Sequence, residues 1–215
     1  MKLIGACAEP CALIYEYLPN GSLEDRLRCK DNTSPLSWQA RDRNAFEICS
    51  ALSFLHSIEP HGIVHGDLKP DNILLDENNT SKICDFGLCR ELYWTASPKG
   101  TFAYMDPEYL STGKITPQFD VYSFGILLLR LGTCKNPRGI RQLVEEAQNK
   151  GTLEALIDSS AGPWPFRETE KLMSLGLRCS DPMRKNRPDL STEVLKEIMS
   201  MLQEASACLL SFNLV

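Results

Sequence analysis

The chain has 215 residues, of which 43% are apolar, and its formal net charge is −5. This apolar content is enough for one substantial hydrophobic core, so we expect a single compact domain. The negative charge disfavours proteins that bind nucleic acids or membrane surfaces, because both functions need a basic face.

Cysteine usage and hydropathy favour a cytoplasmic protein without a membrane span. The nine cysteines are scattered, with no C-x-x-C pair, which is typical of reduced thiols rather than of disulfides or a zinc site. The longest apolar run, residues 124–131, is too short to cross a bilayer. The three histidines, His56, His61 and His65, have no cysteine pair near them, so we do not expect them to bind a metal.

The first part of the chain predicts a strand, a turn and a helix. Residues 12–18 form an apolar run that ends at the turn signal of residues 19–21. Ser22 then can cap a short helix over residues 23–27. Between residues 38 and 57, apolar side chains recur at spacings of three and four, which predicts an amphipathic helix.

The middle of the chain predicts a β-hairpin followed by a long loop. Two short apolar runs, 73–75 and 82–84, are separated by the polar residues 76–81. Residues 86–110 show no period and contain glycine and proline, so we expect a long loop of the kind that often carries function.

The last part of the chain is predicted to be helical. Residues 117–131 are apolar on all sides, so this helix should be buried. Further helices are expected over residues 139–150, 168–179 and 190–204, packed around it. The predicted fold class is therefore α+β and mainly α, a helical bundle with a small β element at one edge.

Polar residues on both sides of the hairpin predict a phosphoryl-transfer site. Asp67 and Asn72 lie five residues apart, and the hairpin should bring Asp85 back close to Asn72, so that the two can share Mg²⁺. Asp67 would then accept the proton of an attacking hydroxyl, while Lys69 offers a positive charge to the transferred phosphoryl group.

The runs His65–Asn72 and Asp85–Gly87 resemble the H-R-D-x-x-x-x-N and D-F-G signatures of the eukaryotic protein kinases. The resemblance implies a kinase that uses ATP and Mg²⁺ on a protein substrate. It implies Asp67 as the catalytic base, Lys69 as a phosphate contact, and Asn72 and Asp85 as Mg²⁺ ligands. It also implies a remnant of the kinase small lobe and hinge over residues 1–18, the large C-terminal lobe over 19–203, and a tail over 204–215.

Further matches follow in the expected order. Residues 100–109 resemble the substrate-binding loop and the A-P-E segment, with Thr101 as the threonine that contacts the base. Asp120 resembles the buried aspartate that hydrogen-bonds the catalytic-loop backbone, and Arg187 is expected to pair with Glu108. His65 and Phe86 are expected to be packing residues.

The resemblance also implies a nucleotide pocket. Tyr15 falls at the gatekeeper position, and residues 16–18 fall at the hinge, where backbone groups would hydrogen-bond adenine. The residues expected to bind the nucleotide are Glu16, Leu18, Ser22 and Leu74, with Leu74 forming the floor under the base.

Tyr15 and the runs 5–7, 19–23 and 104–109 resemble plant kinases of the receptor-like and interleukin-receptor-associated group. Residues 22–27, 65–70 and 185–190 look most like the kinase domain of plant U-box proteins, which join a kinase to an E3 ubiquitin-ligase domain. Gly66 replaces the arginine that usually precedes the catalytic aspartate, as in non-RD kinases. That arginine normally binds a phosphorylated activation loop, so we do not expect phosphorylation to order the activation loop here.

Two alternatives stay open. The chain contains no G-x-G-x-x-G loop and no V-A-I-K lysine, so we expect it to be a truncated serine/threonine kinase that is inactive alone. It could instead be a noncatalytic, pseudokinase-like docking module. It could also be a fragment of a kinase/U-box E3 ligase, in which case a ubiquitin-conjugating enzyme is a partner only if the full-length protein has a U-box.

Overall fold

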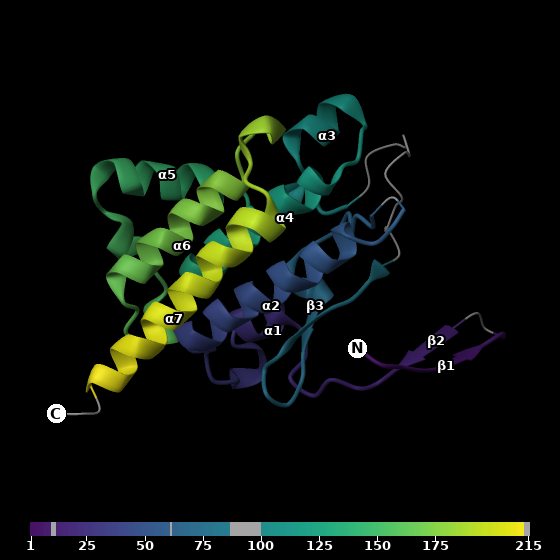
Figure 1. Cartoon of the computed structure of the whole chain (residues 1–215). Coiled ribbons are helices and arrows are strands. Elements are labelled where there is room, and N and C mark those ends of the chain that lie inside the picture. The colour runs from purple at the N-terminus through teal and green to yellow at the C-terminus, as the bar shows by residue number, and fades with distance from the viewer. Residues whose placement is uncertain (10–11, 61, 87–99, 213–215) are drawn as a thin grey trace.

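A computed structural model describes residues 1–9, 12–60, 62–86 and 100–212, with the side chains described up to residue 204. Most of these residues form packed helices, and a two-stranded ribbon extends from them (Figure 1). The ribbon pairs β1 (Leu3–Cys7) with β2 (Ala12–Tyr15) in antiparallel register. The apolar pattern predicted β2, over residues 12–18, and so three residues too long. β1 lies in the part that the resemblance assigned to the small-lobe remnant, but the glycine inside Leu3–Cys7 weakens its strand pattern.

The first helices begin where the sequence predicts. α1 (Leu23–Leu27) starts at Ser22, whose hydroxyl accepts a hydrogen bond from the backbone N–H of Asp25 at 3.1 Å. α2 (Trp38–His56) starts at Ser37, which caps it in the same way. Both helices therefore owe their starts to capping side chains that are visible in the sequence.

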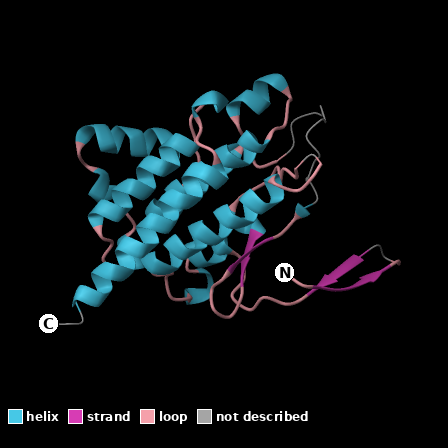
Figure 2. Cartoon of the chain, in the orientation of Figure 1, coloured by secondary structure: helices cyan, strands magenta, loops and turns pink. Residues whose placement is uncertain are grey.

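α4 (Pro117–Thr133) lies within the helical body (Figure 1), and Figure 2 shows that this body is built mostly of helices. Its side chains are buried almost all around, as its apolar circumference predicts. It packs against α2, α5 (Ile140–Lys150) and α6 (Phe166–Cys179), and α7 (Leu195–Phe212) packs against α2 and α6. The predicted fold class, α+β and mainly α, is confirmed.

Two glycines allow α4 and α6 to approach closely. A Cβ atom on Gly125 would lie 2.5 Å from the backbone nitrogen of Ser180 and 2.7 Å from the carbonyl oxygen of Gly176. A Cβ atom on Gly176 would lie 2.6 Å from a methyl carbon of Leu129. The crossing therefore depends on the absence of side chains at both positions.

The predicted hairpin is present, with its second strand one residue earlier than expected. β3 (Ile73–Leu75) pairs with β4 (Ser81–Ile83) in antiparallel register, and Ile73 lies opposite Ile83. The predicted long loop 86–110 is partly wrong, because α3 (Pro107–Thr112) forms inside it after the N-cap Asp106. Its residues 87–99, including the glycine of the D-F-G motif, lie outside the described residues.

Short helical turns connect these elements. The 3₁₀ turns are Lys30–Asn32, Pro70–Asn72, Phe102–Tyr104, Leu153–Leu156, Ser159–Ala161 and Arg184–Asn186, and a π-helical turn over Leu190–Val194 leads into α7. α7 continues past residue 204, where we expected the tail, as far as Phe212. Within the described ranges, no helix combines the length and the hydrophobicity that a bilayer span requires.

Candidate active site

Asp67 is held by hydrogen-bond donors from three other residues. Its Oδ1 atom accepts hydrogen bonds from the backbone N–H and from the hydroxyl of Thr101, each at 2.9 Å. Its Oδ2 atom lies 3.0 Å from Lys69 Nζ and 3.2 Å from Asn72 Nδ2. Asp67 is only 8% exposed, but these contacts direct its carboxylate toward polar groups and not into the hydrophobic core. The local structure thus fixes the orientation of the expected base.

Lys69 and Thr101 complete a triangle with this carboxylate. Lys69 Nζ donates a hydrogen bond to Thr101 Oγ1 at 2.8 Å while it also lies beside Asp67. The positive charge of Lys69 therefore lies beside both the Asp67 carboxylate and the Thr101 hydroxyl. The three residues predicted as base, phosphate contact and substrate-loop threonine are brought together.

Asn72 has one oxygen left for a ligand. Its Nδ2 atom donates to the backbone carbonyl of Asp67 at 2.9 Å, which turns Oδ1 the other way. The backbone carbonyl of Asn72 accepts a hydrogen bond from the backbone N–H of Cys84 at 2.9 Å. The next residue after Cys84 is the exposed Asp85. The hairpin therefore brings the backbone next to Asp85 into contact with Asn72.

An amide oxygen and a carboxylate are ligands that Mg²⁺ accepts, because it prefers hard oxygen donors and keeps several waters. Asn72 and Asp85 fit that requirement. Asp85 also has a positive φ of 62°, a conformation that aspartate adopts more readily than most residues. Within the described residues, no group of three or more His, Cys, Asp or Glu side chains is placed to hold a metal ion.

His65 links the catalytic loop to the segment that carries Asp85. Its ring is fully buried, and Nε2 lies 2.9 Å from the carbonyl oxygen of Cys84. Because that carbonyl only accepts, Nε2 carries the proton, and Nδ1 accepts a hydrogen bond from the N–H of Asp67 at 3.3 Å. The ring also packs edge-to-face on Phe86, with 5.2 Å between centroids. His65 and Phe86 are thus in contact.

Asp120 fixes the backbone just before the expected base. It is completely buried and accepts hydrogen bonds from the N–H groups of His65 and Gly66 at 2.8 and 3.0 Å. The expected contact between this aspartate and the catalytic-loop backbone is therefore present. His56 Nε2 also bonds to Asp120, at 2.9 Å, a partner that the sequence did not reveal. The position of His56 at the end of a predicted helix was the only signal for it.

Two glycines let the loop of Asp67 and the loop of Thr101 meet. Gly66 has a φ of 80° and Gly100 has a φ of 124°, conformations that favour glycine. A Cβ atom on Gly100 would lie 3.1 Å from the carbonyl oxygen of Gly66 and 3.6 Å from Asp67 Oδ1. Glycine at both positions thus permits the approach that brings Thr101 onto the carboxylate.

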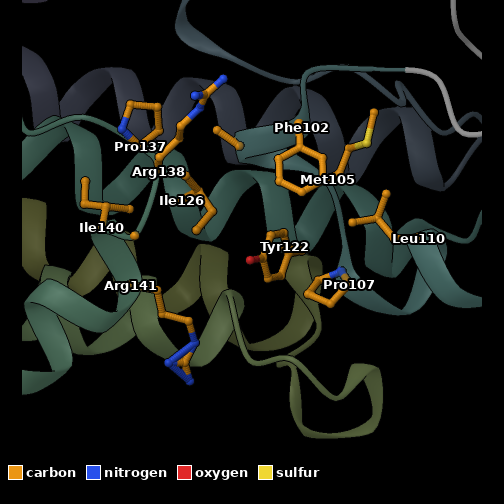
Figure 3. A pocket seen from close by; sticks show the side chains of 12 residues that line it. Phe102, Met105, Pro107, Leu110, Tyr122, Ile126, Pro137, Arg138, Ile140 and Arg141 are labelled. Atoms are coloured by element: carbon orange, nitrogen blue, oxygen red, sulfur yellow. The ribbon is translucent and has the colours of Figure 1, made fainter.

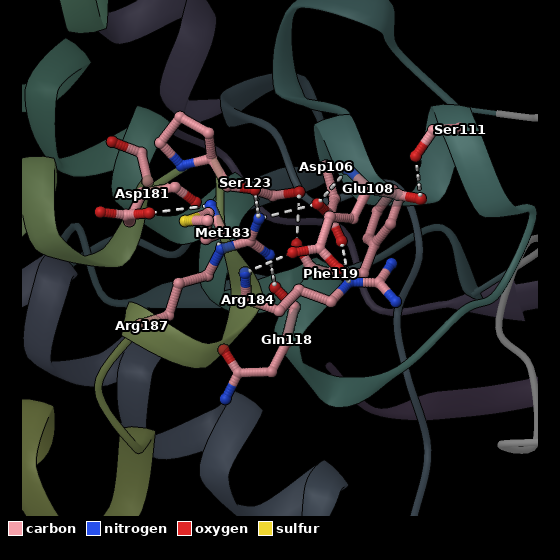
Figure 4. Close-up of polar contacts among 12 residues, drawn as sticks. Asp106, Glu108, Ser111, Gln118, Phe119, Ser123, Asp181, Met183, Arg184 and Arg187 are labelled. Atoms are coloured by element: carbon pink, nitrogen blue, oxygen red, sulfur yellow. Dashed lines mark hydrogen bonds and ion pairs between the residues drawn. The ribbon is translucent and has the colours of Figure 1, made fainter.

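Ion pairs join residues 106–108 to residues 184–187 (Figure 4). The expected pairing of Glu108 with Arg187 is wrong. Arg187 Nη2 instead lies 2.7 Å from Asp106 Oδ1, and both side chains are fully buried. Asp106 caps α3 and directs its carboxylate inward, whereas Glu108 lies in the first turn of that helix and is 41% exposed. Glu108 accepts a hydrogen bond from the backbone N–H of Arg184.

Asp106 is the residue that the sequence analysis missed in this network. Arg184 Nε bonds to its second oxygen at 2.6 Å, so one carboxylate pairs with two guanidinium groups. Burial acts to raise the pKa of Asp106, but the hydrogen bonds and charges of Arg187 and Arg184 outweigh it and hold that pKa below its ordinary value. The carboxylate is therefore kept ionised inside the protein.

The residues expected to bind a nucleotide fall into two groups. Ser22 and Leu74 are paired through their backbones by an isolated β-bridge, and Leu18 nearby in the chain is buried. The hydroxyl of Ser22 is already engaged with Asp25 in the cap of α1. Glu16 instead accepts a hydrogen bond from the backbone N–H of Lys2 at 2.7 Å, at the base of the ribbon.

Comparisons with known proteins show the family of this chain. A sequence model described as protein tyrosine and serine/threonine kinase matches residues 1–198. The chain is 56% identical over 204 residues to U-box domain-containing protein 70 of Oryza sativa subsp. japonica, which covers 90% of this chain and 25% of that protein. It is 53% identical over 220 residues to U-box domain-containing protein 33 of Arabidopsis thaliana, covering 100% of this chain and 26% of that protein.

The chain therefore belongs to the protein tyrosine and serine/threonine kinase family, and it resembles the kinase domain of plant U-box proteins. It spans about a quarter of the length of each of these two relatives. Members of the family generally use ATP and Mg²⁺ and act on protein substrates.

Proposed function

We propose that this kinase-family chain carries the catalytic residues that transfer the γ-phosphoryl group of ATP to serine or threonine hydroxyls of a protein. The observation that supports this most directly is the carboxylate of Asp67, which is oriented by Thr101, Lys69 and Asn72. Positioning and electrostatic stabilisation are the main contributions of enzymes that transfer phosphoryl groups. A carboxylate held in this way is already arranged for that task.

Each residue of the cluster has a separate task. A substrate hydroxyl that approaches Asp67 would donate its hydrogen bond to the carboxylate, which orients the hydroxyl and accepts its proton. Lys69, whose ammonium group lies 3.0 Å from that carboxylate, would face the negatively charged γ-phosphoryl group as it leaves ADP and bonds to the hydroxyl oxygen. Thr101 contacts both and keeps them at this separation.

Asn72 and Asp85 would hold Mg²⁺, which neutralises charge on the phosphates of ATP when it is bound. His65 supports this arrangement, because Nε2 donates to the carbonyl of Cys84, just before Asp85, and Nδ1 accepts a hydrogen bond from the backbone N–H of Asp67. The residues proposed to contact the nucleotide are Glu16, Leu18, Ser22 and Leu74. The hydroxyl of Ser22 would have to leave the cap of α1 to do so, or Ser22 would contribute only its backbone.

We also propose that this chain alone has almost no phosphoryl-transfer activity. None of its 215 residues forms a G-x-G-x-x-G loop or a V-A-I-K lysine to orient the triphosphate. Binding of ATP should therefore be weak but should still depend on Mg²⁺, since the proposed metal ligands are present.

Two measurements test the proposal. In calorimetry, the wild-type chain should bind ATP only with Mg²⁺, and Asp85→Ala should weaken that binding at least about tenfold, a typical cost of a lost metal contact. In a radiolabel assay with a long incubation, Asp67→Asn should lower transfer about 10²- to 10⁴-fold without changing ATP binding. Asp71→Asn is the matched control, because Asp71 is an exposed neighbour outside the cluster.

ATP binding that ignores Mg²⁺, or equal loss in Asp67→Asn and Asp71→Asn, would contradict the assigned roles. A chain that binds no ATP under any Mg²⁺ concentration would support the noncatalytic docking module instead.

For the full-length protein, the names of the relatives support a second activity. Both relatives are U-box domain-containing proteins, so we propose that the longer polypeptide joins this kinase domain to a U-box. A ubiquitin-conjugating enzyme would then be a partner of that other domain. Ubiquitin transfer by the full-length protein, but not by this chain, is the expected result of a ubiquitination assay.

The thiols favour a reducing compartment, and we propose the cytoplasm. Six cysteines among the described residues are free thiols, as is usual in a reducing compartment: Cys7, Cys29, Cys49, Cys84, Cys134 and Cys179. Cell fractionation combined with thiol alkylation should recover the protein in the cytosolic fraction with its thiols reduced.

A further inference from the structure

A small polar cavity lies apart from the residues of the proposed active site. The larger apolar groove beside Thr101, of about 520 Å³, adjoins that site (Figure 3). The polar cavity has a volume of about 270 Å³ and lies between the end of α2, the start of α4 and residues 189–191. Sites for drug-sized ligands have about 300 to 1,000 Å³, so this cavity suits a single side chain or a compact small molecule.

Asp189 offers this cavity a carboxylate oxygen. It caps the π-helical turn Leu190–Val194, and its Oδ1 atom accepts hydrogen bonds from the N–H and hydroxyl groups of Ser191 and Thr192, at 2.8 to 3.0 Å. These bonds, that from the backbone N–H of Thr192 foremost, hold the pKa of Asp189 below its ordinary value, so the carboxylate is ionised. None of the described residues bonds to its Oδ2 atom.

His56 adds a second acceptor to the cavity. Its Nε2 atom lies 2.9 Å from Asp120 Oδ2, and because a carboxylate only accepts, Nε2 carries the proton. Nδ1 of the neutral ring is then an acceptor, and no described residue donates a hydrogen bond to it. Asp120 also holds the N–H groups of His65 and Gly66. An occupant that bonds to His56 would therefore touch the support of the catalytic loop.

The rest of the wall provides further acceptors and no cation. Gln118 Oε1 and Ser53 Oγ are buried without a hydrogen-bond partner among the described residues, a cost that a donor from a ligand would offset. No lysine or arginine is among the described residues that line the cavity. Arg187, which donates to the backbone carbonyl of Gln118, is already paired with Asp106. The C-terminus of α2, the negative end of its helix dipole, lies at this cavity as well.

We propose that this cavity binds a guanidinium or ammonium group, supplied by a basic side chain of a partner protein or by a small amine. Such a group only donates hydrogen bonds and carries a positive charge, so it matches the free acceptors of Asp189 and His56. An anionic ligand is disfavoured, because it would lie beside the ionised Asp189 with no cation in the wall to offset the repulsion. The inference goes beyond phosphoryl transfer and does not depend on it.

Matched charged and neutral probes test the proposal on the whole chain without ATP. n-Butylguanidine and its neutral isostere n-butylurea would be titrated, with binding followed by the amide NMR signals of His56 and Ser191. An acetylated glycine–arginine–glycine amide would be compared with the same peptide carrying citrulline, the neutral isostere of arginine. Each guanidinium probe should bind at least about tenfold more tightly than its neutral partner.

The same titrations distinguish the two sources of the group. Binding of the arginine peptide about tenfold or more tightly than n-butylguanidine identifies a protein side chain as the occupant, because residues beside the arginine then add contacts. Equal affinity of the two guanidinium probes identifies a small amine.

A charge-neutral variant identifies the residue responsible. Asp189→Asn removes the charge but keeps the cap, since asparagine is also a favoured N-cap residue. The advantage of n-butylguanidine over n-butylurea should then fall below about threefold, while amide signals outside the cavity stay unchanged and show that the variant is folded. Asp181→Asn is the matched control, because Asp181 also accepts a backbone N–H, from Met183 at 2.8 Å, and does not line the cavity.

Three results would overturn the proposal. The first is equal binding of charged and neutral probes by the wild type. The second is an unchanged advantage of n-butylguanidine in Asp189→Asn. The third is an equal loss of that advantage in Asp181→Asn, which would show that the general negative charge of the surface attracts the probe.

Discussion

Asp42 is a buried acid without a partner, and its replacement should change how stability depends on pH. It lies in α2, is 7% exposed, and makes no ion pair or hydrogen bond with the described residues. Burial, and to a smaller extent the charge of Glu168, raise the pKa of Asp42 to about 7. An unfolded aspartate has a pKa of about 3.9. Between about pH 4 and pH 7, Asp42 is therefore protonated in the folded chain and ionised in the unfolded chain.

The sign of the effect follows from that difference. The contribution of Asp42 to the free energy of unfolding is fully present below pH 4 and is lost as the pH rises toward 7, where the charged form is buried. Between pH 5 and pH 8, a shift from about 3.9 to about 7 corresponds to a loss of about 2 to 3 kcal/mol. Asp42→Asn removes the titration, so the variant should not lose this amount.

The assay is urea unfolding of the wild type and of Asp42→Asn at pH 5 and at pH 8. The stability of the variant relative to the wild type should rise by about 2 to 3 kcal/mol between the two pH values, because titrations elsewhere cancel. Asp31→Asn is the matched control, since Asp31 is exposed, and its relative stability should not depend on pH. If Asp42→Asn also shows a relative stability that is constant with pH, Asp42 is ionised in the folded chain and the reasoning is refuted.

Three further outcomes are expected from packing and charge. Gly125→Ala should destabilise the fold by at least about 2 kcal/mol in urea unfolding, because the new Cβ meets backbone atoms of α6, whereas Gly5→Ala, which meets nothing within 4 Å, should change little. Arg187→Met should lower stability by about 3 to 5 kcal/mol and Arg184→Met by less, because Arg184 is partly exposed, and equal losses would contradict this ranking. Asp106→Asn should reduce the loss of unfolding free energy that the wild type shows as the pH falls below about 4, because the depressed pKa of Asp106 means that its ionised form stabilises the fold and is lost on acidification. An equally steep loss of unfolding free energy in the variant would contradict this role of Asp106.

Local signals in the sequence were sufficient for most of the fold. The hydroxyl of Ser22 and the apolar circumference of residues 117–131 act within one turn of helix, so the pattern alone identifies α1 and α4. The helix α3 was missed because its six residues carry no period. Its start depends on Asp106 as an N-cap, and this residue lies within the stretch 86–110 that the sequence predicted to be a loop.

The ion pairs were harder to predict because they depend on direction as well as on spacing. Asp106 and Glu108 are two residues apart, and both are acidic, so the sequence cannot say which one faces the interior. In the structure the shorter side chain, at the cap, points inward to Arg187. For the same reason His56 was not recognised as a partner of Asp120, since the residues lie 64 positions apart in the chain.

The centre of the proposed site depends on one face of α4. Asp120 and Ser123 lie three residues apart, so they project from the same side of the helix. Asp120 binds the backbone before Asp67, and Ser123 donates a hydrogen bond to the carbonyl of Tyr104 at 2.7 Å, which fixes the segment that follows Thr101. One buried helix therefore holds both the loop of the base and the loop that contacts it. Because both anchors come from the same rigid element, the contact between Thr101 and Asp67 is maintained without a direct covalent or metal link between the two loops.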